Sequence, residues 1–129
     1  MATHHGKDGT VKIGANTVAE INSFSIDETA DTAEKTAMGD SSKSFLVGVT
    51  TATGTITCYW DETDTSGQGA MTSGASVTLN LYPEGADSGD TYASLTALIT
   101  SIGVSVDMGS VVERSFGWQA TGGVTWSTV

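Results

Sequence analysis

The chain has few of the residues that support covalent or catalytic chemistry. Its 129 residues include one cysteine, Cys58, and two histidines, both close to the N-terminus. A single cysteine excludes an internal disulfide, and a catalytic thiol or serine would need a histidine nearby. Cys58 lies on the apolar side of an alternating run, which favours a buried small hydrophobe. No phosphate-binding loop, CxxC or HExxH motif occurs either, so nothing in the sequence favours an enzyme.

Basic residues are also scarce. The chain has 5 lysines and arginines against 15 aspartates and glutamates, which gives a net charge of −10 and a pI near 4.2. The lysines all lie in the first third, and Arg114 is the only later base. Proteins that grip nucleic acid normally carry a basic footprint, which this chain lacks. Its acidity favours solubility, a salt-rich habitat, or a surface that does not adhere to polyanions.

Long apolar runs and a signal peptide are missing as well. We therefore expect no membrane insertion, and a protein that works or assembles where it is made. A single proline leaves most of the chain free to form strands. A length of 129 residues favours a single domain over 1–129.

Two groups of residues could bind a metal ion. His4 and His5 are adjacent, but neighbouring side chains diverge and no third ligand is evident. The run Asp61-Glu62-Thr63-Asp64 is rich in carboxylates, yet its spacing matches no complete calcium loop. Acidic residues are also common at helix starts. We therefore predict no metal site and no cofactor.

Alternation of apolar and polar residues predicts a β protein. In Ser94–Thr121, Ile102 and Val104 and later Phe116 and Trp118 alternate with polar residues around a turn that contains glycine. Such a pattern is typical of a long antiparallel hairpin with one apolar and one polar face. Further strands are predicted at residues 10–13, 17–28, 45–49, 54–60, 75–81 and 124–128. The fold class is mainly β, an antiparallel sandwich or barrel of about seven or eight strands.

The remaining segments lack this alternation. Residues 1–9 are polar and are expected to form a flexible arm. Residues 29–44 contain one large apolar residue, Met38, and charges of both signs, so we expect a long loop, either functional or merely mobile. Residues 65–73 are the best place for one short flanking helix, although their glycines disfavour it.

The order of these features resembles the major tail tube proteins of long-tailed bacteriophages. The resemblance covers Thr10 to Thr128. Its stretches are Thr36-Ala37-Met38-Gly39-Asp40 leading to Phe45, Gly54-Thr55-Ile56-Thr57 continuing through Trp60-Asp61 and Thr63-Asp64 to Gly67-Gln68, and Gly122-Gly123-Val124-Thr125.

The resemblance implies a structural protein that assembles with itself. Six copies would form a ring, and stacked rings would enclose a conduit for DNA in the virion tail, after assembly in the host cytoplasm. The implied partners are further copies, a tape-measure protein and tail terminator or tip proteins. DNA would pass through without specific binding.

The same resemblance assigns roles to two sets of residues. The polar phase of the long strands would line the lumen, and the long loop would contact a neighbouring ring. The candidate lumen residues are Ser23, Ser25, Asp27, Ser101, Ser105, Asp107, Glu113, Ser115 and Gln119. The candidate inter-ring residues are Asp31, Glu34, Lys35, Met38, Asp40 and Lys43.

Two other functions stay open on the sequence. The inner-tube ring of a contractile injection or type VI secretion device shares the architecture, but its cargo is protein. A monomeric β-sandwich that binds sugars or surfaces would instead expose aromatic residues on a concave face.

Overall fold

The computed structural model describes residues 6–129, which form antiparallel strands with almost no helix. The strands are β1 (Thr10–Ile13), β2 (Asn16–Thr17), β3 (Ile21–Glu34), β4 (Phe45–Tyr59), β5 (Ser76–Tyr82), β6 (Thr91–Ser105), β7 (Glu113–Ala120) and β8 (Thr125–Thr128). Two short 3-10 helices accompany them, η1 (Gly6–Asp8) and η2 (Gln68–Ala70). The predicted mainly-β antiparallel fold is confirmed.

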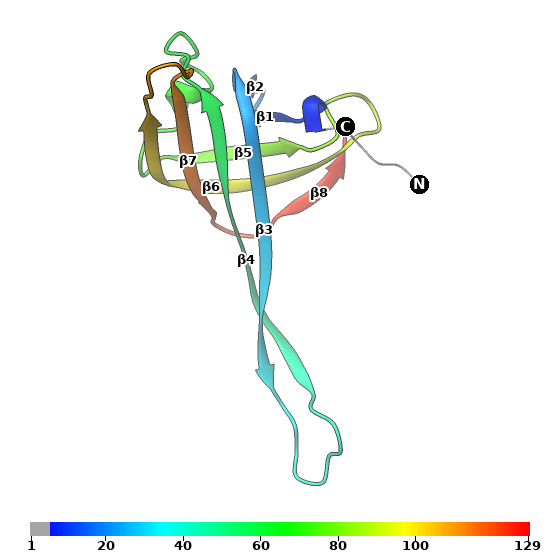
Figure 1. The fold of residues 1–129 in the computed structure, drawn as a ribbon. Coiled ribbons are helices and arrows are strands. Elements are labelled where there is room, and N and C mark those ends of the chain that lie inside the picture. The colour runs from blue at the N-terminus through cyan, green and yellow to red at the C-terminus, as the bar shows by residue number, and fades with distance from the viewer. Residues whose placement is uncertain (1–5) are drawn as a thin grey trace.

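One sheet contains all of the strands and folds over to form two layers. Its order is β2-β1-β5-β6-β7-β4-β3, and β8 pairs with β6. The first part of β6 pairs with β5 and β8, whereas its last part pairs with β7. A register shift between Ile99 and Ser101 lies near this change of partner, and such irregularities bend strands. In Figure 1, β5 and the first part of β6 cross β7, β4 and β3.

The core lies between the two layers, where alternate side chains are buried along parts of β4, β5, β6 and β7. Ile56 of β4 and Phe116 of β7 are directly paired and fully enclosed. In the next row, Gly54 leaves the space that the Trp118 ring occupies, because a Cβ there would overlap both that ring and the Ser25 carbonyl oxygen. The largest fully buried side chains are Trp118, Phe116, Ile56, Met71, Leu79, Leu81 and Ile99.

Strand boundaries differ from the prediction on both sides of β3. A turn at Val18–Glu20 separates β2 from β3, and Glu20 adopts a positive φ of 58°. At the other end β3 continues to Glu34, so residues 29–34 are strand and not loop. The partner strand is also continuous from Phe45 to Tyr59. Backbone pairing extends β3 where no side chain is buried, and periodicity detects burial only.

The predicted flanking helix at residues 65–73 is reduced to η2. The Asp64 carboxylate accepts hydrogen bonds from the backbone N–H groups of Gly67 and Gln68, both at 3.1 Å. It also accepts one from the N–H of Ala19 at 2.8 Å. These bonds tie the segment to the turn before β3, and its glycines disfavour any longer helix.

Gln68 completes this connection from inside the protein. Its side chain is fully buried, and Nε2 donates to the carbonyl oxygens of Ala19 and Tyr59, both at 2.9 Å. Its Oε1 accepts from the Asp61 N–H at 3.2 Å. The amide therefore satisfies three backbone groups, one in the turn before β3 and two at or just after the end of β4, as buried polar groups require.

The predicted flexible arm, residues 1–9, is only partly covered by the structure. Residues 6–8 form η1, with Gly9 following it. His4 and His5, the histidines considered as metal ligands, lie outside the described residues.

Replacing Gln68 by leucine is expected to destabilise the fold. The carbonyls of Ala19 and Tyr59 and the Asp61 N–H would lose their partner, and each unsatisfied buried group costs about 1–3 kcal/mol. We predict a loss of at least about 2 kcal/mol in the free energy of unfolding, measured by urea denaturation. The matched control is Gln119→Leu, at an exposed amide. Equal stability of the two variants would contradict this role.

Candidate assembly surfaces

The face of β3, β4, β7 and β6 that points away from the core carries small polar side chains. Directly paired residues of antiparallel strands share a face, so the register defines rows across these strands. One row is Ser23, Thr57, Ser115 and Gly103; the next is Ser25, Thr55, Gly117 and Ser101; a third is Asp27, Thr53, Gln119 and Leu98; Tyr59, Glu113 and Ser105 form a shorter one. We call these rows the polar face.

All of the predicted lumen residues except Asp107 lie on the polar face. They are Ser23, Ser25, Asp27, Ser101, Ser105, Glu113, Ser115 and Gln119. Asp107 follows the end of β6, where it lines a small hollow with Tyr59 and Glu113. The prediction missed Thr53, Thr55 and Thr57, which bring the central strand β4 onto the same face. Their alternation is visible in the sequence, but assigning them to this face requires the β3–β4 register.

The polar face carries negative charge and no base. Its rows contain the carboxylates of Asp27 and Glu113, and no lysine or arginine occurs in them. The hydroxyls of Ser25 and Thr55 form a hydrogen bond with each other, with 3.1 Å between Oγ and Oγ1. A surface of hydroxyls and carboxylates offers phosphate groups no cation to hold them.

Both edges of the polar face are unpaired within the described residues. At one edge β3 has β4 as its neighbour and nothing beyond it. At the other, the pairing of β6 with β5 ends at Leu98, so residues 101–105 pair with β7 alone. Free strand edges are templates for pairing with another chain.

The distal halves of β3 and β4 extend away from both layers, as Figure 1 shows. We call residues 29–51 the β3–β4 arm, and all of them are exposed except the half-buried Ser44. The arm carries every predicted inter-ring residue, Asp31, Glu34, Lys35, Met38, Asp40 and Lys43. Its tip is ordered by the Lys35 N–H, which donates to the Ser44 carbonyl at 2.8 Å, and by a turn with Gly39 at a φ of 97°.

Apolar side chains also cluster on the arm, and the prediction missed most of them. Besides Met38, the exposed ones are Phe45, Leu46, Val47 and Val49, of which Val49 is 75% exposed. The signal was present in the sequence, because FLVGV is a continuous apolar run in which both strand faces are apolar. Exposed apolar patches mark interaction sites, and an uncovered two-stranded hairpin is only marginally stable.

The acidic run considered as a calcium site has backbone partners instead. Asp61 Oδ1 accepts from the N–H and the hydroxyl of Thr63, at 3.0 and 2.6 Å, and Asp64 binds the backbone as described above. Among residues 6–129 no group of three or more potential metal ligands is found.

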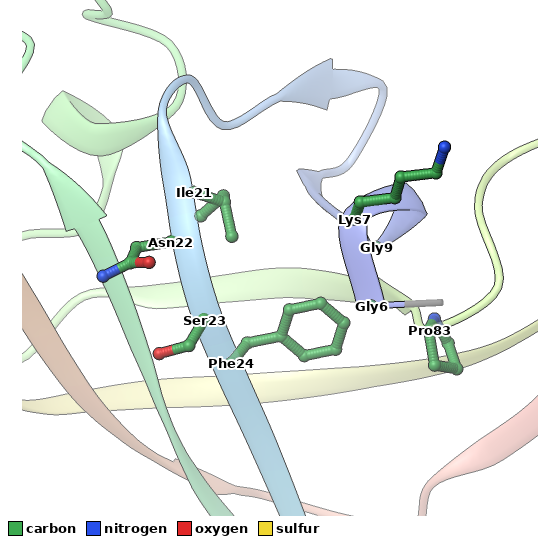
Figure 2. A pocket seen from close by; sticks show the side chains of 8 residues that line it. All are labelled: Gly6, Lys7, Gly9, Ile21, Asn22, Ser23, Phe24 and Pro83. Atoms are coloured by element: carbon green, nitrogen blue, oxygen red, sulfur yellow. The ribbon is translucent and has the colours of Figure 1, made fainter. Parts of the chain in front are cut away.

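A pocket of about 450 Å³ lies between η1 and the free edge of β3. Figure 2 shows the Phe24 ring directed toward η1 and Pro83, whereas the Ser23 hydroxyl points to the opposite side of β3. Lys7 is the one charged residue in the described lining, which contains no carboxylate, thiol or imidazole. The residues that the structure describes around this pocket include no set of groups that could perform acid–base or nucleophilic chemistry.

Comparison with solved structures identifies the architecture. The chain superposes on a chain from the tail of an empty gene transfer agent particle of C6 symmetry, with a TM-score of 0.79 and 17% identity over 98% of this chain and 100% of that one. The SPP1 tail tube gives a TM-score of 0.75 and 14% identity over 98% and 80% of the two chains. This is the tail tube fold. An extracellular contractile injection system, the PVC sheath–tube complex, shares it, with a TM-score of 0.75 and 17% identity over 98% and 93% of the chains.

Comparisons by sequence give no match that adds to this structural likeness. No protein-family model matches the chain, and no curated protein matches its sequence. Within residues 6–129, no helix has the length and apolarity that crossing a membrane requires.

The thiol of Cys58, the only cysteine in the chain, is expected to be unreactive. Cys58 is fully buried, and burial raises its pKa to about 11 from an ordinary value of 9.0. The thiolate is the reactive form, so we predict no labelling by iodoacetamide at pH 8 and full labelling in urea. The same shift makes the native state less stable as the pH rises from about 9 to 11, because the unfolded thiol loses its proton first. A Cys58→Ala variant should lack that part of the pH dependence. Rapid labelling of the native protein would contradict the buried position.

Proposed function

We propose that this chain is the structural subunit of a phage-type tail tube, in which stacked hexameric rings enclose a passage for DNA. The observation that carries the proposal is the polar face. It combines hydroxyls, two carboxylates and no base on strands whose two edges are both free. A solvent-exposed sheet face of a monomer does not require free edges on both sides, whereas a wall built from several copies does.

Edge pairing would join the polar faces of neighbouring copies. The free edge of β3 in one copy would pair with the free end of β6 in the next, which yields one closed barrel and removes both edges. A ring of six is supported by the likeness to the C6 tail of the gene transfer agent particle. In that barrel the predicted lumen residues, together with Thr53, Thr55 and Thr57, would face the bore.

The β3–β4 arm would connect successive rings. It extends beyond the layers that form the core, and within residues 6–129 of a single copy its apolar side chains are exposed. The predicted inter-ring contacts, Asp31, Glu34, Lys35, Met38, Asp40 and Lys43, all lie on it. Exposing apolar side chains to water costs free energy. Burying them in a contact between rings would therefore stabilise the stack.

Other partners follow from this role. A tape-measure protein would fill the bore during assembly, and terminator or tip proteins would close the ends of the tube in the virion. DNA would pass without specific binding, because the bore presents no lysine or arginine in the rows of the polar face. The subunit would perform no catalysis.

An inner tube of a contractile device is the second candidate, favoured by the likeness to the PVC sheath–tube complex. A monomeric binding module is disfavoured, because the exposed aromatic residues Phe45, Trp60 and Trp126 lie on separate elements rather than in one concave row.

Electron microscopy of the concentrated protein tests the proposal directly. We expect tubes of stacked rings with sixfold symmetry and an open bore. Monomers alone, across a range of salt and protein concentrations, would refute self-assembly. Co-assembly with a sheath protein into a contractile particle would favour the second candidate.

Removing the apolar surface of the arm is expected to abolish stacking and leave the subunit folded. The variant is Phe45→Ser, Val47→Ser and Val49→Ser, at side chains that are 53%, 74% and 75% exposed. Exposed substitutions usually change stability by less than about 0.5 kcal/mol each. Circular dichroism and melting temperature should therefore match the wild type while microscopy shows no tubes. Unfolding of the variant would place these residues in the subunit's own core instead.

Reversing the charge of the polar face is expected to make the bore hold DNA. The variant is Asp27→Lys with Glu113→Lys, assayed by co-sedimentation of labelled DNA with the tubes. Binding should appear and weaken with salt, with a slope of about −0.9 per neutralised phosphate. The control, Glu62→Lys with Asp87→Lys, has the same net charge but alters exposed residues off the polar face. Equal DNA binding by both variants would show that lumen charge is irrelevant.

A further inference from the structure

Arg114 is the only lysine or arginine after Lys43 in the sequence, and its side chain lies against two aromatic rings. Its guanidinium carbon lies 5.0 Å from the ring centroid of Trp60 and 5.0 Å from that of Phe116. These rings attract the cation through their π faces and fix its direction. The guanidinium therefore has a fixed position on β7, whereas a lysine side chain at this place would be flexible.

Among residues 6–129 no anion pairs with this cation. Its Nε atom is buried without a hydrogen-bond partner, and no carboxylate among residues 6–129 forms an ion pair with Arg114. The chain has a net charge of −10, so the missing pair does not reflect a shortage of carboxylates. A buried, unpaired donor carries a desolvation cost that a partner would remove.

The surroundings of Arg114 are apolar and uncovered. Val104 is its direct partner on β6 and is 53% exposed, while Trp60 is 42% exposed. All three lie on the side of the sheet opposite the polar face, beyond the end of the core. We call Trp60, Val104 and Arg114 the Arg114 surface; it is an apolar strip with one fixed positive charge.

The arm carries a surface of matching composition. Glu34 pairs directly with Phe45, and Thr32 pairs with Val47, so Glu34, Phe45 and Val47 share one face of the hairpin. The Glu34 carboxylate has no hydrogen-bond or ion-pair partner among the described residues. The Asp40 carboxylate, by contrast, already accepts the Ala37 N–H at 2.7 Å. The arm thus presents one free carboxylate beside two exposed apolar side chains.

The two surfaces lie at opposite ends of the same strand. β4 begins at Phe45 in the arm and ends at Tyr59, immediately before Trp60. Figure 1 shows the arm at one end of the molecule and the turn between β6 and β7 at the other. When copies stack in the same orientation, the arm end of one meets the Arg114 end of the next, which is a head-to-tail contact that propagates.

We propose that the Arg114 surface of one copy receives the β3–β4 arm of a second copy, with Arg114 paired to Glu34. Phe45 and Val47 of the arm pack against Val104 and Trp60, and this burial excludes water from the ion pair. The pairing rests on the stacking proposed above and adds the residues that give it direction and register. Because one side is a cation and the other an anion, two arms or two Arg114 surfaces do not bind each other.

A charge exchange tests the pairing. Arg114→Glu and Glu34→Arg should each abolish tubes, and the double variant, which restores opposite charges, should recover them. Asp87→Arg makes the same charge change as Glu34→Arg at an exposed residue outside the arm and the Arg114 surface, and it should still assemble. Tubes formed by Arg114→Glu, or a double variant that stays unassembled while the wild type forms tubes, would overturn the pairing.

A cysteine pair tests the same contact without altering Arg114. Glu34→Cys with Val104→Cys changes exposed positions only, and Cys58 is buried and needs no substitution. Oxidation should give a ladder of covalent oligomers on a non-reducing gel, because each copy contributes one cysteine upward and one downward. Dimers alone would indicate a symmetric contact and refute the head-to-tail arrangement. A ladder from a protein that forms no tubes would retain the pairing and reject the tube, whereas tubes without a ladder would reject only the pairing.

Discussion

The burial of alternate residues in the second half of β4, from Ala52 to Cys58, is the constraint on which the rest of the structure depends. Ile56 and Cys58 are enclosed in the core, and Thr55 and Thr57 therefore face the other way. A shift of one residue in register would expose the apolar set and bury the hydroxyls, so the core protects the composition of the polar face. The charge of the polar face is in this sense set by the packing of the opposite, core-facing side.

This coupling explains what could be predicted from the sequence. Alternation of apolar and polar residues reports burial. The sequence alone therefore predicts the long hairpin, the fold class and the strand face on which residues such as Ser25 and Ser115 lie. Residues 29–34 were not predicted as strand, because their strand is held by backbone pairing while every side chain stays in water. The reduced helix was also hidden, since Asp64 and Gln68 find their partners at Ala19, far away in the sequence.

The candidate assembly surfaces also have features that the sequence predicts and features that only the structure shows. The charges of the arm stand out in the sequence, and so does the solitary Arg114. The enclosure of Arg114 by Trp60 and Phe116 does not, because the end of β4 must first be brought next to the start of β7. The apolar run from Phe45 to Val49 is equally typical of a core strand, and only its position beyond both layers shows that no other part of residues 6–129 covers it.

The arm is a direct continuation of β4, which lies between β3 and β7. A pull on the arm therefore acts parallel to the strands and across their hydrogen bonds. Bonds loaded in this geometry share the force, whereas a hairpin pulled apart sideways loses them one after another. The arm is thus anchored by hydrogen bonds that a pull along its axis loads in shear, and that pull passes directly into the sheet.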